Sequence, residues 1–204
     1  LKTTLLVTLG ALILGLVIGF LVAIVRSTYE KTKKLKILNF ICNIYITVIR
    51  GTPVVVQLLI IYYVVFGSVK IDKVLVAVLA FGLNSGAYVA EIVRSGIMSI
   101  DSGQLEAGRS LGFNYVQTMR YIIMPQAFKN VLPALGNEFI VLLKETSVAG
   151  YIALQDLTKG GDIIRSRTYS YMPLIAIALI YLTMVLIFTK LLAILERRLR
   201  NSER

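Results

Sequence analysis

The chain has 204 residues, of which 57% are hydrophobic, and it carries a net charge of +11 and a single cysteine. A mean hydropathy of +0.79 and long apolar runs exclude a soluble globular protein and indicate helices that cross a hydrocarbon layer about 30 Å thick. The runs do not alternate, which excludes a β-barrel. Basic cytoplasmic loops explain the net charge better than a nucleic-acid surface does.

Five apolar stretches predict five membrane-spanning helices, and hence an all-α polytopic membrane protein. The first covers residues 4–25. The second, 37–66, is too long for one upright span, and Gly51 and Pro53 interrupt it, so we expect its first part to lie along the membrane interface. The later spans are expected at 74–93, 128–143 and 172–195. With no repeat and no linker visible, residues 1–204 are expected to form one transmembrane domain.

Lys and Arg are unevenly distributed among the connections between these stretches. If the N-terminus lies outside, the inner connections, such as 26–36, carry more of them than the outer ones. Because basic residues accumulate in cytoplasmic loops, we expect the N-terminus outside the cell and the C-terminus in the cytoplasm. The connection between the third and fourth spans is then cytoplasmic, and the protein is expected in the cell membrane.

That cytoplasmic connection contains a polar segment, 104–125, which predicts a short helix and a turn outside the bilayer. Small residues open the segment, Gly112 allows a turn, and Pro125 closes it. This composition is typical of a compact helix-loop that docks on another protein, although a merely solvated loop is the alternative.

The predicted short helix is amphipathic. It can present Leu105 and Leu111 to a groove of a partner. Glu106 and Arg109, three residues apart, can pair with each other or with charges of the partner.

The segment resembles the EAA motif of binding-protein-dependent ABC importer permeases, in which Glu-Ala-Ala precedes a Gly and a terminal Ile-x-Leu-Pro. The matching positions are Glu106, Ala107, Gly108, Gly112, Ile122, Met124 and Pro125. Gly108 replaces the second Ala of the motif and Met124 replaces its Leu. We expect both changes to weaken the helix slightly without removing its surface.

Further stretches resemble the branch of this family that carries polar amino acids. They are Arg50-Gly51-Thr52-Pro53, SGAYVAEIVRSGI at 85–97, and LGNEFIVLLKETS at 135–147. The resemblance covers most of the chain. It implies the permease subunit of a type I ABC importer for polar, in particular basic, amino acids of the histidine, arginine, glutamine or opine type.

The resemblance also implies partners and coupling residues. The partners are two copies of an ATPase subunit that binds ATP and Mg²⁺, a second permease chain that is identical or related, an extracytoplasmic solute-binding protein, membrane lipid and the amino acid. The residues implied to couple the chain to the ATPase are Leu105, Glu106, Ala107, Gly108, Arg109, Leu111 and Gly112. Closure of the ATPase would move the attached spans as rigid elements.

We expect no catalytic site, cofactor or metal site in this chain itself. It lacks a Gly-x-x-x-x-Gly-Lys-Ser/Thr loop, and its Gly160-Gly161 pair is followed by Asp162 where a lysine would be needed. The sequence contains no histidine, which excludes histidine-based proton relays and most nucleophilic triads. The chain is therefore not expected to be an enzyme, and ATP hydrolysis is expected in a separate chain.

Polar residues near the middle of two spans are candidates for substrate binding, because such residues are costly in lipid and usually face a pathway. They are Asn84, Ser85 and Tyr88 in the third span and Glu138 at a comparable depth in the fourth. The alternatives are that Asn84 and Ser85 hold helices together and that Glu138 forms an ion pair.

Lys159 and Asp162, in the connection before the fifth span, can supply opposite charges to an amino acid if that connection dips into the cavity. A solvated loop is the favoured alternative. We hypothesise that Glu138 and Asp162 favour arginine, lysine or histidine over glutamate.

Other conspicuous polar residues receive structural interpretations. Glu91 and Arg94, three apart, predict a local ion pair, with a gate as the alternative. Arg50 is expected to anchor at lipid headgroups rather than to contact substrate. Gln57 is expected to form an interhelical hydrogen bond.

The function expected from these features is ATP-driven import of polar amino acids by alternating access. Two other classes remain open: a passive channel, which predicts uptake without ATP, and a membrane scaffold, which predicts no ATPase partner stimulated by a ligand.

Overall fold

The computed structural model describes residues 1–201, and every regular element within them is helical. The α-helices are α1 (Lys2–Thr32), α2 (Lys36–Gly51), α3 (Val54–Ile60), α4 (Lys73–Met98), α5 (Gly103–Ser110), α6 (Tyr115–Thr118), α7 (Met124–Glu145), α8 (Leu157–Thr168) and α9 (Met172–Asn201). Short helices of other pitch adjoin them: η1 (Ile61–Val65), η2 (Met119–Ile123) and η3 (Thr146–Ile152). The all-α fold class is confirmed.

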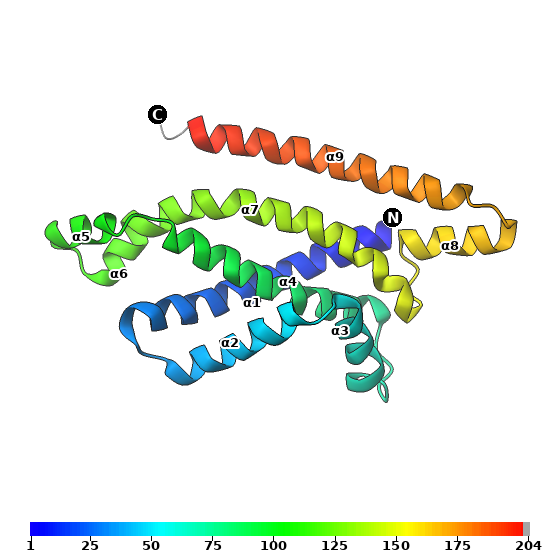
Figure 1. The fold of residues 1–204 in the computed structure, drawn as a ribbon, viewed down its shortest axis with the longest axis horizontal. Coiled ribbons are helices and arrows are strands. Elements are labelled where there is room, and N and C mark those ends of the chain that lie inside the picture. Colours follow the sequence, from blue (N-terminus) through cyan, green and yellow to red (C-terminus); the bar gives the residue numbers. More distant parts are fainter. Residues whose placement is uncertain (202–204) are drawn as a thin grey trace.

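Three long helices, α1, α4 and α7, form the centre of the molecule and run along its long axis (Figure 1). Small residues let α1 and α4 approach closely. A side chain at Gly15 would press on Ser85, and one at Gly19 would overlap Val89. Glycine at these positions therefore permits backbone-to-backbone packing, the kind of contact that joins helices in a membrane.

The predicted interruption of the second apolar stretch is confirmed as a sharp bend. The helices on either side of the break, Lys36–Gly51 and Val54–Val65, meet at 109°. Pro53 has no backbone N–H and caps the start of α3, while Thr52 before it is extended. The Gln57 amide nitrogen donates to the Ile49 carbonyl at 2.7 Å and to the Thr52 carbonyl at 3.0 Å, so a side chain satisfies carbonyls that the break leaves free.

Fewer spans than the predicted five meet a strict test of length and hydropathy. Within residues 1–201, α1, α4 and α9 meet it, and the bent pair adds a fourth if it is one span. The expected fourth span, 128–143, is present as part of α7 but is not among the helices that pass. The helices extend beyond the expected limits; α1, for example, continues to Thr32.

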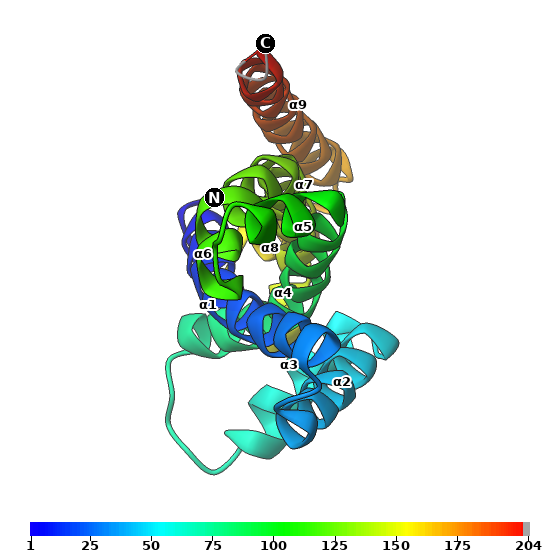
Figure 2. The same cartoon turned by 90° about the vertical axis from the view of Figure 1, so that its left-hand side faces the viewer.

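The two ends of the molecule carry different elements. The helices α5 and α6 lie at one end of the long axis, whereas α8 and the N-terminus lie at the other (Figure 1). The helix α9 stands out from the central helices and contacts the chain through α7 and α8 (Figure 2). No residue in the apolar window of α9 is buried, so the part of its surface that does not contact α7 and α8 is free for lipid or for another chain.

Candidate functional site

The polar segment 104–125 forms a compact helical hairpin at one end of the molecule (Figure 1). Its first helix, α5, is followed by a turn at Gly112, where φ is +82°. The second helix, α6, begins with a capping box in which the Asn114 side chain accepts from the Gln117 backbone and the Gln117 side chain accepts from the Asn114 backbone. Local caps and one left-handed glycine thus define the hairpin.

Gly108 lies where α5 and α6 touch, and it is buried. A side chain there would come within 2.8 Å of the Thr118 hydroxyl oxygen and 3.1 Å of the Ile122 side chain. From the sequence, glycine at this motif position was expected only to weaken the helix slightly. In the structure it has a further role. It permits the close approach of the two helices.

The other residues of α5 divide between the two sides of the helix. Glu106, Ala107 and Arg109 are exposed. Leu105 packs into the chain's own core beside Ile123, so of the two leucines expected in a groove only Leu111, 72% exposed, is open. Within residues 1–201 no ion pair joins Glu106 to Arg109, which leaves both charges available to a partner.

Two of the predicted substrate residues meet in the interior. The Ser85 hydroxyl of α4 donates to a Glu138 carboxylate oxygen of α7 at 2.8 Å, and Ser85 and Glu138 are 0% and 7% exposed. Within the described residues Glu138 has no ion-pair partner, contrary to the alternative that it forms one. A buried carboxylate with a single neutral donor still lacks a counter-charge.

Asn84 is buried beside this pair but faces another helix. Its amide nitrogen donates to the Gln57 side-chain oxygen at 3.1 Å. The interhelical hydrogen bond expected of Gln57 is therefore confirmed, and Asn84 is its donor. This contact links α4 to the α2–α3 break.

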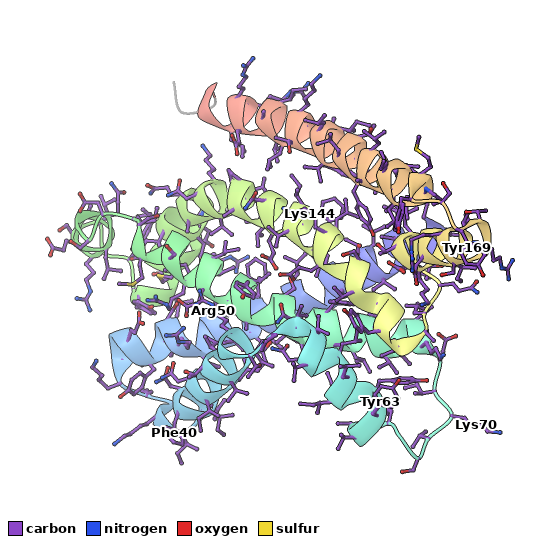
Figure 3. All side chains as sticks on the ribbon, turned by 45° about the vertical axis from the view of Figure 1, so that its right-hand side comes forward. Phe40, Arg50, Tyr63, Lys70, Lys144 and Tyr169 are labelled. Atoms are coloured by element: carbon purple, nitrogen blue, oxygen red, sulfur yellow. The ribbon has the colours of Figure 1, made fainter. Side chains whose placement is uncertain are left out.

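Tyr88, one turn beyond Ser85 on α4, holds a basic side chain. The guanidinium carbon of Arg50 lies 5.2 Å from the centre of the Tyr88 ring. Arg50 is exposed in the single chain and lies at the end of α2, toward α4 (Figure 3). The α2–α3 break turns Arg50 onto an aromatic face of the central helices, and its expected role as a headgroup anchor stays a prediction.

An ion network joins α1 to α4 farther toward α5. The predicted Glu91–Arg94 pair is confirmed, with a nitrogen–oxygen distance of 3.1 Å. Glu91 also pairs with Arg26, and Arg94 pairs with Glu30 at 3.4 Å. Neither partner on α1 was predicted, although Arg26 and Glu30, four residues apart, lie on one helix face.

A cavity of about 610 Å³ opens between the end of α2, the second half of α4 and the first half of α7. It is lined by Arg50, Glu91, Ile92, Arg94, Ser95, Gly96, Ser99, Asn130 and Ala134. Glu138 is not among the lining residues, but Ala134, one turn before it on α7, is.

Lys159 and Asp162 lie at the other end of the molecule, on α8. The Lys159 ammonium is 3.2 Å from Asp162, and the Arg165 guanidinium is 2.7 Å from the same carboxylate. These two cations hold the pKa of Asp162 below its usual value, Arg165 having the larger effect. The structure does not bring this pair together with Asn84, Ser85, Tyr88 and Glu138.

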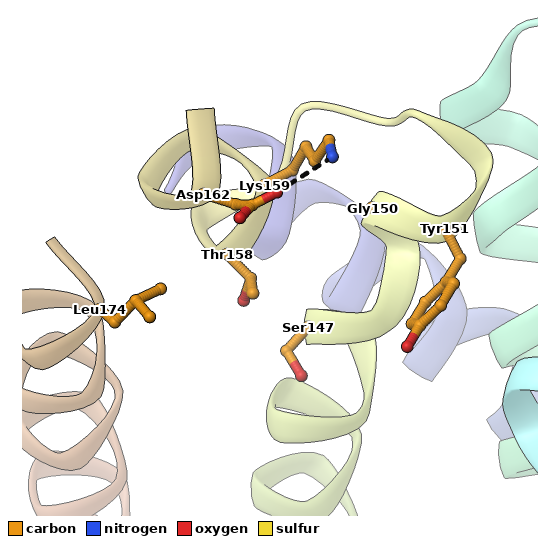
Figure 4. Close-up of a pocket in the computed structure, with 7 residues that line it drawn as sticks. All are labelled: Ser147, Gly150, Tyr151, Thr158, Lys159, Asp162 and Leu174. Atoms are coloured by element: carbon orange, nitrogen blue, oxygen red, sulfur yellow. Dashed lines mark hydrogen bonds and ion pairs between the residues drawn. The ribbon is translucent and has the colours of Figure 1, made fainter. Parts of the chain in front are cut away.

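Lys159 and Asp162 line a shallow cavity of about 300 Å³, together with Ser147, Tyr151 and Thr158 (Figure 4). The connection here is a regular helix, α8, whose N-terminus is capped by the Asp156 side chain. The part of the connection that carries Lys159 and Asp162 is therefore regular, and the irregular, buried part precedes it at η3 and residues 153–156. Asp162 already has two cationic partners, so it offers no free charge to a substrate.

Comparison with known sequences relates the whole chain to transport proteins. Residues 5–201 match the family described as binding-protein-dependent transport system inner membrane component. The chain is 40% identical to the arginine transport system permease protein ArtQ of Bacillus subtilis (strain 168), over 97% of this chain and 91% of that protein. It is 38% identical to the glutamine transport system permease protein GlnP of Escherichia coli (strain K12), over 98% and 90% respectively.

Solved structures agree with these sequence matches. A crystal structure of an amino acid ABC transporter with histidines superposes with a TM-score of 0.89 at 47% identity, covering 97% of this chain and 91% of that one. An inward-facing MetNI methionine ABC transporter superposes with a TM-score of 0.82 at 19% identity, over 97% and 93%, and supports the fold alone. The chain therefore belongs to the family of binding-protein-dependent transport system inner membrane components, the non-catalytic permease subunits of ABC importers.

Proposed function

We propose that this permease carries polar amino acids with a cationic side chain into the cytoplasm by alternating access. The observation that carries this proposal is the Ser85–Glu138 pair between two central helices, a buried carboxylate for which residues 1–201 provide no counter-ion. An ammonium or guanidinium group of a substrate would supply the missing charge, and only while the substrate is bound.

The predicted substrate residues take different parts in this proposal. Ser85, Tyr88 and Glu138 meet the amino acid, whereas Asn84 acts through Gln57 to position the α2–α3 break. Lys159 and Asp162 form a local ion pair of the outer connection. The relatives named for arginine and for glutamine agree with a polar amino acid, and Glu138 favours the cationic one.

The hairpin 104–125 is proposed to couple the permease to ATP hydrolysis. It would bind in a cleft of an ATPase subunit that binds ATP and Mg²⁺. Two features support this role. The exposed side of α5 carries Glu106 and Arg109 without internal partners among the described residues, and Leu111 is open beside them. The packing at Gly108 makes the hairpin rigid enough to transmit a movement into α7.

A complete importer is proposed to contain two permease chains, two ATPase subunits and an extracytoplasmic binding protein. The uncovered apolar surface of α9 suits lipid or a second permease chain. The hairpin and the N-terminus lie at opposite ends, which agrees with a cytoplasmic hairpin and an external N-terminus (Figure 1).

The test is ATP hydrolysis by the purified complex in lipid nanodiscs, with its binding protein and a panel of amino acids. We expect arginine, lysine or histidine to stimulate hydrolysis more than glutamine, and Glu138→Gln to remove that preference. Full preference for cationic substrates in Glu138→Gln would contradict the assignment of Glu138. Uptake into vesicles without ATP would instead indicate a channel, and a complex that no ligand stimulates would indicate a scaffold.

A further inference from the structure

We infer that Arg50, held on the ring of Tyr88, binds the carboxylate of the transported amino acid while Glu138 binds its cationic side chain. This inference rests on the proposed function and names a second, oppositely charged end for the same site. Arg50 is a charged residue in the last turn of α2, beside the α2–α3 break and against the central helix α4.

Arg50 has no counter-charge among the residues that the structure describes. Among residues 1–201 no ion pair includes it, and its guanidinium is placed by the aromatic face of Tyr88. A ring face attracts a cation but leaves the edge of the guanidinium, with its N–H donors, free. Those donors match a carboxylate in a two-point contact.

The break that carries Arg50 is held in place. Gln57 donates to the Ile49 and Thr52 carbonyls on either side of Arg50, and it accepts from Asn84 of α4. The last turn of α2 is therefore tied to the same helix that carries Ser85 and Tyr88. A fixed guanidinium loses less conformational freedom when it binds an anion than a mobile one does.

Among the charged residues around the cavity, Arg50 is a cation for which residues 1–201 provide no acidic partner. Arg26 and Arg94 are paired with Glu91 and Glu30, so the two acids are matched by two arginines. Arg50 lines the same cavity of about 610 Å³ as Glu91 and Arg94 but adds a positive charge without an acid. The cavity wall next to Tyr88 therefore favours an anion.

The two residues of α4 that contact the proposed ends of the site are close together in the helix. Ser85, which donates to Glu138, and Tyr88, which holds Arg50, are three residues apart on α4, about one helical turn, roughly 4.5 Å along the axis. Ala134, one turn before Glu138, also lines the cavity beside Arg50. In the proposed arrangement, an extended amino acid in this cavity would place its carboxylate on Arg50 and point its side chain toward Glu138.

A purely structural role for Arg50 makes a different prediction. A cation in the last turn of α2 also interacts favourably with the helix dipole. If that were its role, a substitution would lower stability and weaken binding of every ligand alike. A carboxylate subsite would weaken only ligands that carry a carboxylate.

The experiment measures equilibrium binding of arginine and of agmatine, which is arginine without its carboxylate, to the assembled permease–ATPase complex in nanodiscs without the binding protein. We expect wild type to bind arginine about tenfold or more tightly than agmatine, as a hydrogen-bonded charge contact allows. Arg50→Gln should reduce arginine affinity to that of agmatine and leave agmatine unchanged. Glutamine and its decarboxylated analogue 4-aminobutanamide provide the same comparison for a neutral side chain.

Two variants keep the test interpretable. Arg50→Lys preserves the charge at the helix end and should retain part of the preference for arginine, since an ammonium makes a weaker contact with a carboxylate. Arg167→Gln removes a basic side chain of α8 far from the cavity and should bind both ligands as wild type does. Equal thermal stability of these variants would show that the assembly is intact.

Several results would overturn the inference. In Arg50→Gln, these are an equal loss of affinity for arginine and agmatine, or no loss of affinity for either. In wild type, the contradicting result is equal affinity for the two ligands. A loss of affinity seen only in nanodiscs with anionic lipid would assign Arg50 to lipid headgroups. Failure of the proposed function is a separate result, because no amino acid would then stimulate ATP hydrolysis through the binding protein. Failure of this subsite alone leaves that stimulation intact.

Discussion

Two carboxylates, Glu138 and Asp162, were both candidates for substrate binding from the sequence, and the structure places them in different environments. Glu138 is 7% exposed and receives one neutral hydrogen bond, from Ser85. Asp162 has a side chain 36% exposed and is paired with both Lys159 and Arg165. One acid is buried without a counter-charge, whereas the other is near solvent with two.

This difference shows which acid can bind a cation. A substrate that approaches Asp162 must displace two existing partners in water, where such pairs contribute little. A substrate that reaches Glu138 supplies the only full charge opposite a buried carboxylate, which is a much stronger interaction. Burial and the absence of a counter-ion therefore matter more for a substrate site than the type of residue does.

The largest effect is expected from Glu138→Gln. Loss of one partner in a buried charge contact costs about 2–5 kcal/mol, so we expect binding of a cationic amino acid to fall by about thirtyfold or more. Equilibrium binding of arginine to the complex in nanodiscs measures this change. Asp162→Asn is the matched control, and a loss of the same size in that variant would contradict the comparison.

A smaller effect on coupling is expected from Gly108→Ala. The added methyl group would press on Thr118 and separate α5 from α6, an overpacking that costs about 1–3 kcal/mol. Ligand-stimulated ATP hydrolysis should fall while ligand binding stays unchanged.

The matching rescue of Gly108→Ala is Thr118→Ala, which makes room for the new methyl group. The double variant should recover most of the stimulation, as measured in a double-mutant cycle with both single variants. Additive losses in that cycle would mean that the contact between residues 108 and 118 does not control coupling.

A still smaller effect, on stability, is expected from Glu91→Gln. This change removes the ion pairs with Arg26 and Arg94 and leaves two arginines close together. The network is partly exposed, so the expected loss of stability is about 1–2 kcal/mol. Thermal unfolding of the complex at low and at high salt measures it, and the difference from wild type should shrink as salt rises. A difference that does not depend on salt would argue for a packing effect.

The smallest effect concerns the pH dependence of Asp162. Because its pKa is lowered in the folded protein, its ion pairs stabilise the fold above the usual carboxyl pKa, and this contribution disappears as the pH falls through the lowered value. Thermal melts of wild type and Asp162→Asn across acidic pH should therefore differ most near neutrality and converge in acid. Melting curves that diverge in acid would give the opposite sign and contradict this explanation.

Much of the fold and of the family could be derived from the sequence alone. Apolar runs of bilayer length require helices, since backbone groups in lipid must be satisfied within their own segment. Gly51 and Pro53 predicted the break, because proline removes a helix hydrogen bond locally. The spacing of Glu106, Gly108 and Gly112 predicted the helical hairpin and the family. All of these are properties of short stretches of chain.

The tertiary structure alone decided which polar groups have partners. Residues 53 positions apart, Ser85 and Glu138, meet because α4 packs beside α7, and no local pattern specifies that register. The bend after Arg50 turns a side chain expected at lipid headgroups onto Tyr88. The free energy of a buried charge depends on what surrounds it in three dimensions. The sequence could place Glu138 in a span and Asp162 in a connection, but only the packing shows that, among the described residues, Asp162 has two cationic partners and Glu138 has none.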